Sequence, residues 1–314
     1  MSSHVIRRLI LIGLMVLLAG VLTALNPVFL TAGNINKMFQ EAAQIGIVAI
    51  GFTLVMITAG IDMSVGGIIA MTAMLSINFI AHTKLPVILF VPITLFVGAL
   101  TGLVNGFFIA RFKLPAFIVT LATLLTLRGI DLVITGGTSI SGLPEAFTVI
   151  GQDRIFGLRI SLLLFVVLAV VIGYALKNHR YLQQAYFIGG NRRAARMSGV
   201  KVERFIVFAF VLNAVLAGIA GIVVCSQYGA ASVSYGQNAE LRVIAATAIG
   251  GTSFSGGSGT ITGTVLGVIF LAMIYNAFNM SGINTYWQDV AIGVMLLAAV
   301  FLGEYLKRRR IART

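Results

Sequence analysis

The chain has 314 residues, of which 59% are hydrophobic and only 10% are charged, and its mean hydropathy is +1.02. A soluble domain carries about 25% charged residues, so this composition excludes a soluble globular protein and predicts a polytopic helical membrane protein. The net charge of +13 excludes little by itself, but the basic residues fall in loops and tails, which favours membrane lipid and acidic protein surfaces over nucleic acid as partners.

Ten apolar segments are candidates for membrane spans. They lie at 9–25, 45–60, 64–81, 86–110, 115–135, 161–176, 205–227, 241–252, 261–281 and 287–305. If the N-terminus is inside, an even number of spans places the C-terminus inside too, and most of the Lys and Arg residues then fall on that side. The predicted fold class is an all-α polytopic membrane protein of about ten transmembrane helices, formed by a single domain over residues 1–314.

The first loop and two of the spans are unusual. Residues 26–44 are expected to form a helix that lies on the outer membrane face before the chain re-enters. The segments 45–60 and 241–252 are short, since about 16 helical residues reach only about 24 Å. Each of the two leads into a glycine-rich break, so we expect broken or short helices there.

The two breaks share a G-x-x-x-S-x-G spacing. Its members are Gly60, Ser64 and Gly66 in the first break and Gly251, Ser255 and Gly257 in the second. Interrupted apolar segments in both halves of a chain point to a substrate pathway, because irregular backbone at membrane depth is tolerated only where protein or water surrounds it. Glycines that merely allow close helix packing explain the pattern equally well.

Polar residues within the spans extend the candidate pathway. They include Asn105, Thr120, Thr123, Asn213, Asn276 and Asn279. Some could line a path for a hydroxylated solute, although for any single residue a hydrogen bond between helices is the favoured interpretation. Asp62 could touch substrate or cap the helix that starts near Ser64, and the cap is favoured. Arg128 and Asp131, three residues apart on one helix, are expected to neutralise each other.

The residues that could carry catalysis form no recognisable cluster. His4, His82 and His179 lie in loops or in the tail, and Cys225 lies in an apolar run, so no zinc site, thiolate site or disulfide framework is expected. The sequence also lacks a G-x-G-x-x-G or Walker motif. We therefore expect neither an enzyme nor a cofactor bound by this chain.

The loop 178–204 is strongly basic, with a single acid, Glu203. Gly189-Gly190-Asn191 is predicted to be a turn that ends in a helix N-cap, followed by about two turns of helix over 192–198 and by a left-handed Gly199. A short capped helix between two spans suits docking to another protein. A solvated loop that only fixes topology through its charge is the alternative.

Four collinear stretches resemble one family, the permease subunits of bacterial ATP-binding-cassette importers for ribose, other monosaccharides and autoinducer-2. They are ITAGIDMSVGG (57–67), PAFIVTLATLLTLRG (115–129), GGNRRAARMSGV (189–200) and IGGTSFSGGSGTITGT (249–264). The resemblance implies the type II importer permease fold in the bacterial inner membrane, with both termini cytoplasmic. It implies a second permease subunit, identical or homologous, a periplasmic sugar-binding protein outside and a cytoplasmic ATPase that uses ATP and magnesium.

The same resemblance makes 178–204 the loop that couples the permease to its ATPase. The residues that carry over are Gly190, Asn191, Arg192, Ala194, Ala195, Arg196, Ser198 and Gly199. Arg242 departs from the family, whose members commonly have an acidic residue after Glu-Leu at that point. Two rival functions are an ion-coupled secondary sugar transporter, for which only Asp62 and Asp131 could serve as ion sites, and an intramembrane enzyme.

Overall fold

The computed structural model describes residues 3–82, 89–284 and 286–311. Its helices are α1 (Ser3–Leu25), η1 (Pro27–Leu30), α2 (Ala32–Ile57), α3 (Val65–His82), α4 (Phe90–Arg111), α5 (Ala116–Thr135), α6 (Glu145–Gln152), α7 (Ile160–Asn178), α8 (Arg180–Gly190), α9 (Arg192–Met197), α10 (Val202–Tyr228), α11 (Ala239–Ile249), α12 (Ile261–Met280) and α13 (Tyr286–Ile311). Four two-residue strands pair as β1 (Ile140–Ser141) with β4 (Ala230–Ala231) and β2 (Arg154–Ile155) with β3 (Leu158–Arg159), both antiparallel. The predicted all-α polytopic fold is confirmed.

Each of the ten predicted spans falls on a helix, but the helices differ in length. Seven are long and apolar enough to cross a membrane, namely α1, α2, α4, α5, α7, α10 and α12. The apolar described parts of α3 and α13 are shorter, and α11 has only 11 residues, as the short 241–252 segment predicts. A helix of 11 residues rises about 16 Å, so α11 crosses only part of a bilayer.

The expected separate helix over 26–44 is wrong. Asn26 caps η1, and then α2 runs without a break from Ala32 to Ile57, so the predicted surface helix and the predicted 45–60 span are one helix of 26 residues. Continuous α2 extends about 39 Å, which removes the reason to treat 45–60 as a short span. Its later turns are buried at the centre of the bundle while its first turn is exposed.

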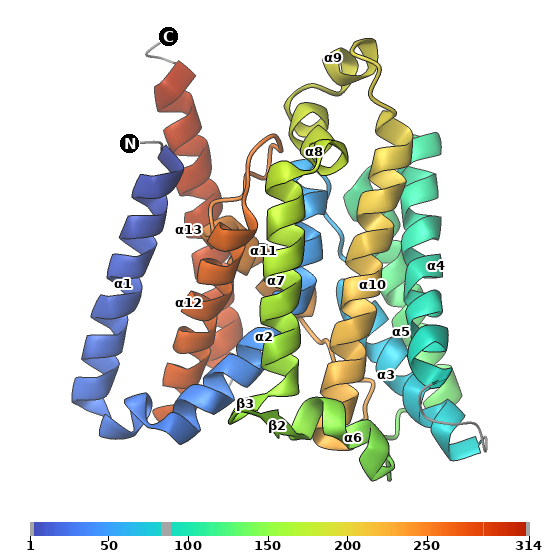
Figure 1. Cartoon of the computed structure of the whole chain (residues 1–314), viewed down its shortest axis with the longest axis vertical. Coiled ribbons are helices and arrows are strands. Elements are labelled where there is room, and N and C mark those ends of the chain that lie inside the picture. Colours follow the sequence, from blue (N-terminus) through green and yellow to red (C-terminus); the bar gives the residue numbers. More distant parts are fainter. Residues whose placement is uncertain (1–2, 83–88, 285, 312–314) are drawn as a thin grey trace.

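Helices α2 and α10 form the centre of the bundle, and α10 packs against α2, α3 and α4 (Figure 1). Helix α4 carries a stripe of glycines, Gly98, Gly102 and Gly106, which lets α4 and α10 approach each other closely. A side chain at Gly102 would come within 2.6 Å of the Phe210 carbonyl oxygen. Small residues four apart let helix backbones approach in lipid, where dispersion rather than hydrophobic burial holds helices together.

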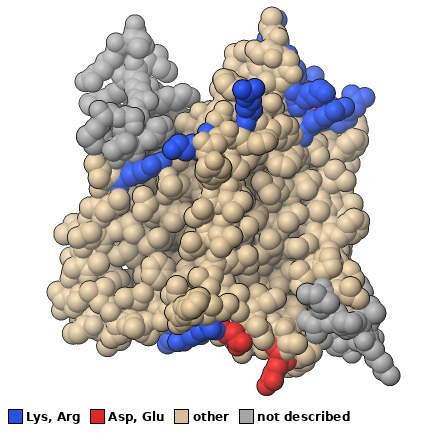
Figure 2. All heavy atoms as spheres, in the orientation of Figure 1, with Lys and Arg blue, Asp and Glu red and all other residues tan. Residues whose placement is uncertain are grey.

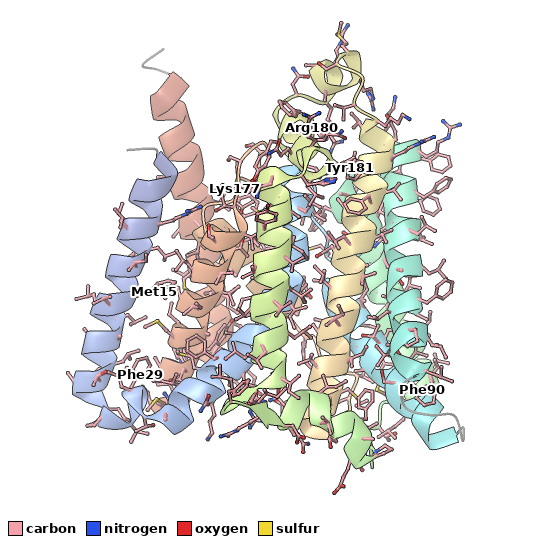
Figure 3. All side chains as sticks on the ribbon, in the orientation of Figure 1. Met15, Phe29, Phe90, Lys177, Arg180 and Tyr181 are labelled. Atoms are coloured by element: carbon pink, nitrogen blue, oxygen red, sulfur yellow. The ribbon has the colours of Figure 1, made fainter. Side chains whose placement is uncertain are left out.

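Both described chain ends and α9 lie at one end of the molecule, while β2, β3 and α6 lie at the other (Figure 1). On the face that Figure 2 shows, Lys and Arg side chains gather toward the α9 end above a broad band without charge. Figure 3 places Lys177 and Arg180 at this same end, with apolar side chains projecting along the helices below them. The distribution is that expected of a bundle that crosses a membrane.

Candidate functional site

The first break, between α2 and α3, is fixed by a buried polar network. Asp62 accepts hydrogen bonds from the Ser64 backbone N–H at 3.0 Å, from the Ser64 hydroxyl, and from the Asn213 amide on α10 at 2.9 Å. Asn105 on α4 donates to the Ser64 hydroxyl oxygen at 3.0 Å and accepts from the Thr123 hydroxyl on α5 at 2.6 Å. The network thus ties non-helical backbone to three spans.

Several predicted pathway residues therefore bond to protein in this structure. Asp62, Ser64, Asn105 and Thr120 are fully buried, and the Thr120 hydroxyl accepts from the Met63 backbone N–H at 2.9 Å. Farther away, Asn276 exchanges two hydrogen bonds of 2.8 Å with Asn34. This geometry supports the interpretation of these side chains as links between helices, and the Asp62–Ser64 bonds form a turn just before α3.

We expect Asn213→Ala to destabilise the bundle. The substitution leaves a buried carboxylate oxygen of Asp62 without its amide donor, which costs about 1–3 kcal/mol of folding free energy. Thermal unfolding of the purified protein in detergent measures the change. Asn178→Ala, which removes an exposed amide bonded to the Tyr174 carbonyl, is the matched control, and equal midpoints for the two variants would contradict the prediction.

The second break shares spacing with the first but not conformation. Gly251, Gly256 and Gly257 all have positive φ, at 91°, 77° and 72°, whereas Gly66 lies in the first turn of α3. A side chain at Gly66 would overlap the Glu240 carboxylate and come within 2.5 Å of the Gly236 carbonyl oxygen. The shared motif thus reflects a common need for small residues rather than a repeated local fold.

The basic loop folds largely as predicted around Asn191 and Gly199. The Asn191 side chain accepts from the backbone N–H groups of Arg193 and Ala194, each at 3.0 Å, so it is the N-cap of α9. Gly199 has φ of +83° and ends that helix. The predicted turn at 189–190 is wrong, because both glycines are the last residues of α8.

The end of α8 joins the loop to both breaks. A Cβ at Gly189 would overlap the Ile57 carbonyl oxygen and the Gly257 backbone nitrogen, and Gly257 N–H donates to that same Ile57 oxygen at 2.8 Å. The Arg192 guanidinium donates to the Thr58 carbonyl at 3.2 Å. We call Ile57, Thr58, Gly189, Arg192 and Gly257 the three-way junction, since it brings together the two breaks and the loop.

A further bond supports the three-way junction. The Tyr186 hydroxyl on α8 donates to the Gly259 carbonyl of the second break at 2.9 Å. Burial raises the pKa of Tyr186, so the phenol stays protonated and able to donate. Sequence reasoning missed Tyr186 and Gly189 as contact residues. The paired glycines of GGN were the available signal, although the pattern does not say which backbone they face.

Arg192 and Arg196 are four residues apart, a spacing that places two side chains on one face of a helix, but they do not share one outward surface. The Arg192 guanidinium points back to the Thr58 carbonyl. Burial of this guanidinium, and to a lesser extent the neighbouring positive charge of Arg196, lowers the pKa of Arg192. Arg196 instead pairs with Glu203, with Nε 2.9 Å from the carboxylate. Ala195 is only 4% exposed, whereas Met197 is 83% exposed. The large exposed apolar side chain of α9 is therefore Met197.

Arg128 and Asp131, which are expected to neutralise each other, make no direct ion pair in the part of the chain that the structure describes. The Arg128 guanidinium donates to the carbonyls of Val233 and Gly236, at 3.2 and 3.1 Å. Both carboxylate oxygens of Asp131 are buried without a hydrogen-bond partner among the residues that the structure describes. Arg128 thus holds the loop between α10 and α11, while its positive charge still acts on the Asp131 carboxylate of its own helix.

Apolar helices interrupted by buried, polar-bonded breaks are the architecture of a membrane transport protein. The family model described as "Branched-chain amino acid transport system / permease component" matches residues 34–300, and the chain belongs to this family. As a permease component it is a transport subunit rather than an enzyme.

Three relatives show the extent of the similarity. The chain is 33% identical over 301 residues to the ribose import permease of Haemophilus influenzae, covering 95% of this chain and 93% of the relative. It is 36% identical over 295 residues to the ribose import permease of Bacillus subtilis, covering 93% and 91%. It is 32% identical over 344 residues to the xylose transport system permease of Escherichia coli, covering 90% and 87%. No solved structure matches the chain.

Proposed function

We propose that this chain is the permease subunit of an ATP-binding-cassette importer that moves a monosaccharide such as ribose or xylose into a bacterial cell. The observation that carries the proposal is similarity over nearly the full chain to permeases for these two pentoses. ATP and magnesium are used by a separate subunit. Residues 1–314 act as one transmembrane domain and bind no cofactor.

The three-way junction gives this proposal a mechanical basis. A cytoplasmic ATPase docks on α9 and moves α8, whose last turn touches the end of α2 and the second break. Because Arg192 holds the Thr58 carbonyl, a displacement of α9 also pulls on the first break. Both breaks thereby respond to one movement of the loop.

The basic end of the molecule faces the cytoplasm in this proposal. Lys and Arg gather there, and both described chain ends lie at the same end of the molecule as α9, as an even number of crossings of the inner membrane requires. The opposite end, with α6 and the two short pairs of strands, receives a periplasmic sugar-binding protein. A second permease subunit, identical or homologous, completes the transmembrane unit.

The energy source decides between this proposal and an ion-coupled secondary transporter. We expect proteoliposomes holding the permease, its ATPase and its binding protein to accumulate labelled D-ribose or D-xylose only when ATP is present on the ATPase side. Dissipating the proton and sodium gradients should leave the uptake rate unchanged. Uptake driven by a gradient without ATP would overturn the proposal in favour of the secondary transporter.

A further inference from the structure

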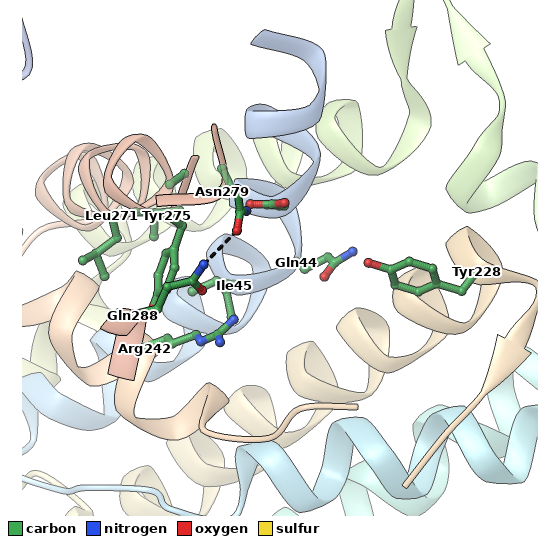
Figure 4. Close-up of a pocket in the computed structure, with 12 residues that line it drawn as sticks. Gln44, Ile45, Tyr228, Arg242, Leu271, Tyr275, Asn279 and Gln288 are labelled. Atoms are coloured by element: carbon green, nitrogen blue, oxygen red, sulfur yellow. Dashed lines mark hydrogen bonds between the residues drawn. The ribbon is translucent and has the colours of Figure 1, made fainter. Parts of the chain in front are cut away.

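A small polar pocket lies in the half of the bundle away from α9. Its wall includes Gln44 of α2, Arg242 of α11, Tyr275 of α12 and Gln288 of α13, and its volume is about 190 Å³ (Figure 4). Gln44 lies about 20 Å along α2 from the three-way junction at Ile57. The pocket is therefore separate from the contacts described above.

Two side chains of the pocket carry buried donors without an acceptor among the residues that the structure describes. Tyr275 is only 9% exposed, and its hydroxyl finds no partner in the described part of the chain. The Nε of Arg242 is likewise buried without a partner there. The guanidinium carbon of Arg242 lies 4.7 Å from the centroid of the Tyr275 ring, so the two groups form one unit. Buried donors of this kind are costly unless something else accepts from them.

The other polar groups of the wall can both donate and accept. Gln288 donates to the side-chain oxygen of Asn279 at 2.8 Å (Figure 4). Gln44 donates to Gln227 on α10. Each amide keeps further donor or acceptor capacity, since an amide can make up to four hydrogen bonds. Glu41 stands in the same wall as Arg242, so one negative and one positive group line the pocket. This balance favours an uncharged ligand.

The remaining wall is apolar and the space is small. Ile45, Val268 and Leu271 supply aliphatic surface beside the Tyr275 ring. Pockets for drug-sized ligands occupy about 300–1,000 Å³, so this one suits a smaller solute. A cyclic solute with several hydroxyls can form hydrogen bonds with the polar side chains of the wall. Its C–H groups can pack against the aliphatic side chains.

We propose that this pocket is a binding subsite for a neutral monosaccharide, in which Tyr275 and Arg242 donate hydrogen bonds to sugar hydroxyls. The inference rests on the proposed function, because the sugar is the cargo of the importer. It adds a place for the cargo within one permease chain, between α2, α11, α12 and α13. It also gives a role to Arg242, the residue that departs from the family pattern.

The test is direct sugar binding to the full-length permease in lipid nanodiscs, by equilibrium dialysis against labelled D-ribose and D-xylose. Tyr275→Phe removes one donor and keeps the ring, so we expect the Kd to rise about 3- to 10-fold, the range for one lost hydrogen bond. Arg242→Gln removes the stacked donor and should raise the Kd further. Tyr174→Phe, which alters an exposed ring on α7, is the matched control and should leave the Kd unchanged.

Uptake by the reconstituted importer separates this inference from the proposed function. If the wild-type importer takes up either pentose while the wild-type permease binds neither, or while both variants bind it with unchanged Kd, the pocket holds only water and the subsite is refuted. The proposed function would stand in that case. If the wild-type importer takes up neither sugar with ATP present, the proposed cargo is wrong and the subsite fails with it.

Discussion

We expect Gly189→Val to abolish ATP-coupled transport. Its side chain would overlap the Ile57 carbonyl oxygen and the Gly257 backbone nitrogen, which already share a hydrogen bond of 2.8 Å. Neither atom belongs to a flexible side chain, so the last turn of α8 must move away from both breaks. Forcing extra carbons into a close-packed site typically destabilises the packed state by about 1–3 kcal/mol. In Gly189→Val this destabilisation weakens the contact between α8 and the two breaks.

Gly13→Val is the matched control for that experiment. Gly13 lies in α1, outside the three-way junction, and a Cβ there meets no atom within 4 Å in the described part of the chain. ATP-driven sugar uptake and sugar-stimulated ATP hydrolysis should both survive in Gly13→Val. In Gly189→Val, uptake should be lost while the purified complex retains the ATPase. Equal activity of the two variants would show that the three-way junction transmits nothing.

Local signals in the sequence predicted the parts of this molecule that depend on local physics. Asn191 caps α9 because an asparagine side chain reaches backbone N–H groups two and three residues ahead, and Gly199 ends α9 because that position has positive φ. The break after Ile57 followed from its clustered glycines and from the buried charge of Asp62. Such features need no knowledge of the rest of the fold.

The errors concern partners that lie far away in sequence. Gly189 faces Ile57 across 132 residues, and nothing in a GGN pattern identifies that carbonyl. Helical spacing predicts a contact between Arg128 and Asp131, but the hydrogen-bond acceptors of Arg128 are carbonyls more than 100 residues away in sequence. A guanidinium in a membrane bundle takes whichever oxygens the fold brings near it, so spacing alone is a weak guide.

The pocket residues illustrate a further limit. Gln44, Arg242, Tyr275 and Gln288 come from four different helices, and none stands in a motif with another. In the sequence, Arg242 stands out only as a departure from a family pattern. Its proposed role depends on Tyr275, whose buried hydroxyl has no partner among the described residues, and that burial depends on how the helices pack.

We expect Met197→Asp to weaken ATPase binding by at least about 10-fold, which corresponds to roughly 1.4 kcal/mol. Met197 is the large exposed apolar side chain of α9, and a carboxylate there would have to be desolvated in a partner groove. Thermal stability of the permease alone should not change. By contrast, Ala195→Glu places a charge at a buried position, so its effect on docking would be mixed with loss of loop structure. Pull-down of the ATPase by the permease measures both variants.

The role of Arg196 in ATPase binding can be determined by exchanging Arg196 with its ion-pair partner, Glu203. Arg196→Glu breaks the ion pair with Glu203, whereas the double variant Arg196→Glu/Glu203→Arg restores an ion pair with the charges reversed. If Arg196 only shapes the loop, the double variant recovers ATPase binding, because loop geometry is all that matters. The single variant Glu203→Gln breaks the same ion pair but keeps the positive charge of Arg196. If the ATPase binds that positive charge, only Glu203→Gln retains binding, and the double variant binds as weakly as Arg196→Glu. An ion pair exposed at this level contributes about 0–1 kcal/mol to folding, so stability changes little in any of the three, and the pull-down reports on docking.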